Sequence, residues 1–176
     1  MSPTSIRNIL IQTLLRSEMS TERTWARYTV IASALIWIGM LLGVSFIATP
    51  AKFLAPSLTL PVALDVGRQT FGVFSIVEVI ASLLLLTAAA VSRCHGRIVV
   101  LAALVGSLVA LQFFWLLPAL DARVEIILQG GVPEQSQLHS LYIAIEFTKA
   151  LLLGVVLWSA HANSFESARG GAANAR

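Results

Sequence analysis

The sequence predicts an all-α integral membrane protein, a four-helix bundle with both termini in the cytoplasm. Three observations predict this fold class. The 176-residue chain is 57% hydrophobic and only 12% charged, with a mean hydropathy of +0.82, whereas soluble domains carry about 25% charged residues. Four apolar segments each have about the 20 residues that are needed to cross a bilayer. The Lys and Arg residues are concentrated in segments that would share one side of the membrane.

The chain begins with a leader, residues 1–27, and the first predicted span follows at residues 28–48. The leader mixes arginines with apolar side chains, so it is either a short interfacial helix or a disordered cytoplasmic leader, and the sequence favours neither. Met19 is an alternative to Met1 as the translation start. Pro50 is expected to end the first span, because proline disrupts a helix interior.

The second predicted span covers residues 71–92, with an extension back to Val62, and follows a proline-rich outer loop at residues 49–67. Polar or small side chains recur along it at helical spacing, which places them on one face. Glu78 follows Arg68 by ten residues, or about 15 Å along a helix, so it falls inside the membrane and needs a partner. This face consists of Asp65, Arg68, Gly72, Ser75, Glu78 and Ser82.

The third predicted span covers residues 98–118 and follows a tight basic turn at residues 93–97. The turn contains the single cysteine, Cys94, which excludes an intramolecular disulfide and is typical of a reducing compartment. Gln112 is the only strongly polar side chain in this span. Pro118 is expected to end the helix and to begin the second outer loop.

The fourth predicted span, residues 140–160, carries a carboxylate and an ammonium well inside an apolar segment. Four polar side chains recur there at spacings of 3, 4 and 3, which places them on one helical face. A charge at the bilayer centre costs roughly 2.5–3.5 kcal/mol, so these groups should face the bundle interior and have partners. They are His139, Tyr142, Glu146 and Lys149. The tail at residues 162–176 is expected to be disordered in the cytoplasm.

The orientation is predicted from the distribution of Lys and Arg. With four spans, eight of these residues share the side of the termini and three lie on the other side. This asymmetry predicts cytoplasmic termini, two outer loops and a multi-pass protein of the bacterial inner membrane. The eight are Arg7, Arg16, Arg23, Arg27, Arg93, Arg97, Arg169 and Arg176, and the three are Lys52, Arg68 and Arg123.

Two groups of candidate site residues follow from these spans. In the predicted orientation, the polar faces of the second and fourth spans lie at similar depths in the outer half of the membrane. The candidate intramembrane site consists of Glu78, Glu146, Lys149 and Tyr142. The candidate outer mouth consists of Asp65, Arg68, Asp121, Arg123 and His139.

The intramembrane charges allow two interpretations. In the first, they neutralise one another and fix the packing of a non-enzymatic accessory or structural protein. In the second, they form the site of a small membrane oxidoreductase or transporter-like protein, which binds a lipophilic or quinone-like molecule from the outer side. A packed core beside Glu78 and Lys149 would favour the first, and a cavity would favour the second. The expected partner is the lipid bilayer, with a homo-oligomer or a membrane partner protein as open alternatives.

The sequence contains no recognisable catalytic, metal-binding or phosphate-binding motif, so no catalytic residue, metal or cofactor is predicted. His95 and His161 would lie on the side opposite to His139, which excludes a transmembrane pair of haem ligands. The basic residues are dispersed along the chain, and no nucleic-acid partner is predicted.

Three motifs carry a resemblance to a known group of proteins. They are Trp37-Ile38-Gly39, the Pro118-Ala119-Leu120-Asp121-Ala122-Arg123 segment, and His139-x-x-Tyr142-x-x-x-Glu146-x-x-Lys149. Together they resemble a family of four-helix bacterial inner-membrane proteins of unknown function, broadly similar in layout to DoxX-like and anthrone-oxygenase-like small membrane proteins. The resemblance covers about residues 28–160. It implies a four-span layout in the inner membrane and assigns no catalytic residue.

Overall fold

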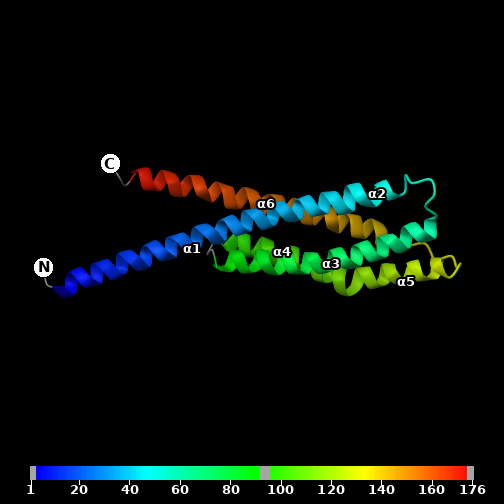
Figure 1. Cartoon of the computed structure of the whole chain (residues 1–176), viewed down its shortest axis with the longest axis horizontal. Coiled ribbons are helices and arrows are strands. Elements are labelled where there is room, and N and C mark those ends of the chain that lie inside the picture. Colours follow the sequence, from blue (N-terminus) through cyan, green and yellow to red (C-terminus); the bar gives the residue numbers. More distant parts are fainter. Residues whose placement is uncertain (1–2, 92–95, 174–176) are drawn as a thin grey trace.

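The computed structural model describes residues 3–91 and 96–173, and this part of the chain contains helices and turns but no strands. Four long helical rods lie side by side (Figure 1). The first rod is continuous through α1 (Pro3–Leu41), the π-helical segment η1 (Leu42–Ala48) and α2 (Thr49–Lys52). The second rod is α3 (Leu60–Val91). The third runs through α4 (Gly96–Leu111), the π-helical segment η2 (Gln112–Leu116) and α5 (Leu117–Leu128), and the fourth is α6 (Leu138–Ala173).

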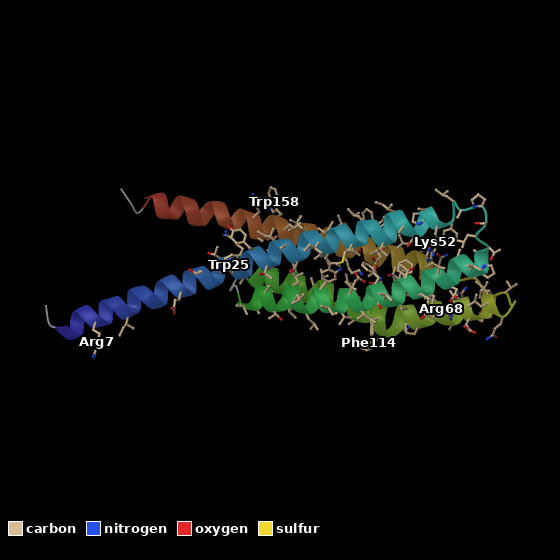
Figure 2. All side chains as sticks on the ribbon, in the orientation of Figure 1. Arg7, Trp25, Lys52, Arg68, Phe114 and Trp158 are labelled. Carbon is tan, nitrogen blue, oxygen red and sulfur yellow. The ribbon has the colours of Figure 1, made fainter. Side chains whose placement is uncertain are left out.

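The two ends of the bundle differ in character (Figure 1). α1 begins and α6 ends at one end, which we name the terminal end. The connections at residues 53–59 and 129–137 lie at the other end, which we name the loop end. Trp25 and Trp158 are both exposed and lie toward the terminal end in Figure 2, a placement that suits aromatic side chains at a membrane interface.

All four rods contain a segment long and apolar enough to cross a membrane, so the predicted all-α four-helix fold is confirmed, and the side on which the termini lie stays a prediction. These segments are Thr24–Lys52, Leu60–Val91, Gly96–Leu128 and Leu138–Ala162. Large apolar side chains are exposed along them, for example Ile36, Val73 and Phe147. In a bilayer such a surface contacts lipid, since acyl chains are as apolar as the side chains themselves.

The interior of the bundle follows the helical period. Val30, Ala34, Trp37 and Leu41 are spaced by four, three and four residues on α1, and all four are fully buried. They belong to the main apolar cluster, to which α3, α4 and α6 also contribute. Alanines are frequent in this cluster and let helix backbones approach closely. A smaller cluster of Leu116, Leu117, Tyr142 and Ile145 is separate from it.

Neither Pro50 nor Pro118 ends its helix, which corrects the prediction made for both. The helix containing Pro50 continues to Lys52, and the helix containing Pro118 continues to Leu128. Each proline follows the last residue of a π-helical segment by two positions. A proline normally clashes with the carbonyl of residue i−4. The wider π turn moves that carbonyl away and leaves the helix continuous.

Both loop-end connections are consequently shorter than predicted. The first contains residues 53–59 rather than 49–67, and it starts with turn hydrogen bonds from Phe53 to Pro50 and from Leu54 to Ala51. The second contains residues 129–137. It turns at Gly130, where φ is +80°, a conformation that favours glycine because the residue has no Cβ.

The two terminal segments also differ from the expected bounds. α1 begins at Pro3, so the leader is a helix continuous with the first span. α6 reaches Ala173, so the expected disordered tail is helical over residues 162–173. Extending a formed helix costs far less than nucleating a new one, and both extensions continue a long spanning helix. Residues 93–95 of the predicted basic turn, with Cys94 and His95, lie outside the described residues.

Candidate functional site

A buried cluster of two carboxylates and one ammonium lies in the bundle interior. The Nζ atom of Lys149 lies 2.5 Å from Oε1 of Glu78 and 2.8 Å from Oε1 of Glu146. The three side chains are at most 2% exposed. The structure therefore brings Glu78 to the pair on α6, and the sequence analysis expected this contact from their polar faces.

Three neutral donors complete the cluster, and none of them was among the predicted site residues. The indole N–H of Trp37 donates to Oε1 of Glu78 at 3.0 Å. Glu146 accepts from Nε2 of Gln112 at 2.9 Å and from Oγ of Ser45 at 3.0 Å. Tyr142 also interacts with Glu146 through its hydroxyl group. All four rods thus contribute to one hydrogen-bonded cluster.

The two π-helical segments supply two of these donors. Ser45 lies in η1 and Gln112 lies in η2, and both bind the same carboxylate, that of Glu146. A π turn changes the direction in which the following side chains project, and such turns are frequent at functional sites. A polar residue five or six positions before a proline inside an apolar span is the sequence signal for this arrangement.

A cavity of about 320 Å³ reaches Glu146. Among the lining residues are Ser45, at the polar end, and the rings of Phe46, Phe53, Phe71 and Tyr142. Neither Glu78 nor Lys149 belongs to the lining. Glu146 is therefore the member of the charged cluster that a small molecule in this cavity would meet.

A second cavity of about 320 Å³ lies next to the first, toward the loop end. Thr49, Phe53, Phe71, His139 and Tyr142 line both cavities. The second is also lined by charged side chains, namely Lys52, Arg68, Asp121 and Arg123. Lys52 and Arg68 appear at the loop end in Figure 2. The linings of the two cavities together extend from the charged side chains of the loop end to Glu146.

The polar residues of the predicted outer mouth meet at this end. Arg68 bonds Asp65 on its own helix and Glu125 on α5, each at 2.9 Å. Arg123 donates to the backbone carbonyl of Glu134 rather than to Asp121. Asp121, Arg123 and His139 share the lining of the second cavity with Arg68. Glu125 was not predicted as part of this mouth, because Pro118, seven residues before it, was expected to end the helix.

Within residues 3–91 and 96–173, no group of three His, Cys, Asp or Glu side chains is arranged to hold a metal ion. No model of a known protein family, no curated protein and no solved structure matches the chain.

Proposed function

We propose that this integral membrane protein binds a small lipophilic molecule in the cavity beside Glu146, as a transporter-like protein or a small membrane oxidoreductase would. The observation that carries the proposal is the position of Glu146 at the polar end of an aromatic cavity. Ligand sites are typically apolar cavities of 300–1,000 Å³ with a few well-placed polar groups. Ionisable residues inside membranes mark substrate and proton pathways in many membrane proteins.

Each part of the cavity has a role in this proposal. The rings of Phe46, Phe53 and Phe71 contact the apolar body of the ligand, while Ser45 and Glu146 bind its polar group. The ligand arrives through the second cavity at the loop end, which shares Thr49 and Tyr142 with the first. Binding is the part of the function that this geometry supports.

A structural role for the charges is the second candidate, and the Glu78–Lys149 pair favours it. Both side chains are fully buried, and neither lines the cavity. A buried polar contact of this kind can specify which helices pack together. The two candidates are compatible, since Glu78 and Lys149 would fix the bundle while Glu146 binds the ligand.

The proposed function is tested by mass spectrometry of the full chain purified in a mild detergent. Thr49→Phe places a ring where the two cavities meet, so the variant should lose a small molecule that the wild-type protein retains. Thr148→Phe is the matched control. The hydroxyl group of Thr148 donates to the carbonyl of Ala144 on the same helix. The side chain of Thr148 is exposed on α6 and lies outside both cavities. Equal retention by wild type and Thr49→Phe, or no retained molecule in either, would contradict the proposal.

We also propose that the termini are cytoplasmic in a bacterial inner membrane, so that the loop end faces outward. The support is the distribution of Lys and Arg along the sequence, which four spans would divide into eight on the side of the termini and three on the side of Lys52, Arg68 and Arg123. A reporter fused after Arg176 is expected to be active only in its cytoplasmic form. A reporter inserted near Gly130 is expected to be active only in its exported form. The reverse result at either position would contradict this orientation.

A further inference from the structure

We infer that the cavity beside Glu146 takes a hydrophobic monovalent cation, which exchanges for a proton held by the Glu146 carboxyl group. This inference rests on the proposed function and adds the chemical class of the ligand.

The first argument is the charge of the buried cluster. Two carboxyl groups share one ammonium, so full ionisation would leave a net charge of −1 on side chains that are at most 2% exposed. An uncompensated charge inside a bilayer is costly. The cluster is therefore neutral when one carboxyl group holds a proton or when a cation lies beside it. Lys149 neutralises the other carboxylate in both states.

Glu146 is the carboxyl group of the cluster that exchanges its proton. Glu78 is bonded by Trp37 and Lys149 and does not line the cavity. Glu146 does line it, so a proton that leaves this carboxyl group has a route toward the loop end. The titratable groups that face Glu146 are Lys149 and Tyr142 on its own helix and Glu78 on α3. η1 and η2 contribute the neutral donors Ser45 and Gln112, and His139 lines the same cavity.

The third argument is the aromatic wall. The cavity is lined by four rings, from Phe46, Phe53, Phe71 and Tyr142. Phe71 and Tyr142 form an edge-to-face pair with centroids 5.0 Å apart. The faces of aromatic rings attract cations, and cages of such rings recognise quaternary ammonium groups. The Lys52 ammonium already lies 5.2 Å from the centroid of the Phe53 ring, so a ring of this wall accepts a positive charge within the protein itself.

The charges at the loop end are balanced and present no barrier to such a cation. Arg68 is paired with Asp65 and Glu125. Asp121 lines the second cavity, which Lys52 and Arg123 also line. These six side chains contribute three positive and three negative formal charges.

The exchange is balanced in atoms and charge and needs no oxidant or reductant. The O–H bond of the Glu146 carboxyl group breaks, the proton leaves through the cavity, and the carboxylate pairs with the incoming cation. One proton is released for each cation bound. Binding of the cation therefore tightens as the pH rises, because proton release is linked to cation binding.

The test uses the full chain in mild detergent and two probes of nearly equal shape. Benzyltrimethylammonium carries a permanent charge and no proton of its own, and neopentylbenzene is its neutral carbon analogue. Calorimetric titration in two buffers of different ionisation enthalpy should report one proton released per bound benzyltrimethylammonium and none for neopentylbenzene. Glu146→Gln should weaken binding of the cation at least tenfold and retain the neutral probe, because glutamine has the shape of the protonated acid. Glu18→Gln, at an exposed position on α1, should behave as wild type.

The outcomes separate this inference from the proposed function. Cation binding without proton release, or unchanged cation affinity in Glu146→Gln, would overturn the exchange at Glu146. Binding of neopentylbenzene alone would overturn the cationic class and leave the proposed function standing. Failure of both probes would overturn the inference, and the molecule retained by wild type but not by Thr49→Phe would then decide the proposed function separately.

Discussion

Lys149→Met will lower the free energy of unfolding by about 3–5 kcal/mol at neutral pH, since removing one partner of a buried ion pair strands the charge that remains. Lys149 is fully buried and is bonded to both Glu78 and Glu146. Its loss leaves two carboxyl groups close together with no ammonium between them. The cost should shrink as the pH falls, because both groups can then take up protons and become neutral.

A double-mutant cycle on thermal stability in detergent measures this coupling. Lys149→Met combined with Glu78→Gln should recover much of the loss, because the second change removes a stranded carboxylate. Lys52→Met is the matched control, because it makes the same substitution at a half-buried lysine of the loop end without an ion pair among the described residues. Strict additivity of the Lys149 and Glu78 changes would show that the two residues are not coupled.

Trp37→Phe will lower the free energy of unfolding by about 1.5–3 kcal/mol, the typical contribution of a hydrogen bond to a charged group. Trp37 is the largest fully buried side chain, and its indole N–H donates to Glu78 at 3.0 Å. Phenylalanine keeps an aromatic ring at this position but cannot donate a hydrogen bond. Glu78 is then held by Lys149 alone among the described contacts.

Trp158→Phe supplies the control for this prediction. Trp158 lies on α6 with 75% of its surface exposed, and a substitution at an exposed site usually changes stability by less than about 0.5 kcal/mol. Thermal unfolding followed by circular dichroism would compare the two variants under identical conditions. Equal losses would mean that the hydrogen bond from Trp37 contributes nothing specific to Glu78.

Helical periodicity accounts for the part of the site that could be predicted. The spacing of Tyr142, Glu146 and Lys149 places them on one face of a single helix, whatever the neighbouring helices are. The cost of a charge in the membrane then requires that this face point inward. Helical spacing and the cost of a buried charge likewise predict that Glu78, on the second span, faces the bundle interior. The four spans themselves follow from length and hydropathy alone.

The donors from the other helices could not be predicted in the same way. Trp37 is a largely apolar residue of the first span. Nothing in its local sequence indicates that its indole N–H donates to a carboxylate on α3. Ser45 and Gln112 reach Glu146 from π-helical segments. An ideal α-helical spacing places side chains differently from a π turn, so the regular period used for prediction fails at these positions.

The helix ends at the two prolines were predicted wrongly for a similar reason. Proline is a reliable helix breaker only when the preceding turns keep α-helical geometry. In this protein a π turn precedes both Pro50 and Pro118, and the helices continue. The continuation brings Glu125 on α5 to Arg68 and carries Lys52 into the lining of the second cavity. The arrangement of the loop end could therefore not be predicted, because the sequence pattern does not show where a π turn replaces an α turn.

The claim that a cavity gives small molecules access to Glu146 but not to Glu78 is tested most directly by labelling with a hydrophobic carbodiimide. N,N′-dicyclohexylcarbodiimide reacts with protonated carboxyl groups in apolar surroundings, and peptide mass spectrometry locates the product. We expect modification at Glu146, little at Glu78, and protection of Glu146 by benzyltrimethylammonium. Modification of Glu78 to the same extent, or an unmodified Glu146, would contradict the account, because the carboxylate reached from the loop end would then not be the one that lines the cavity.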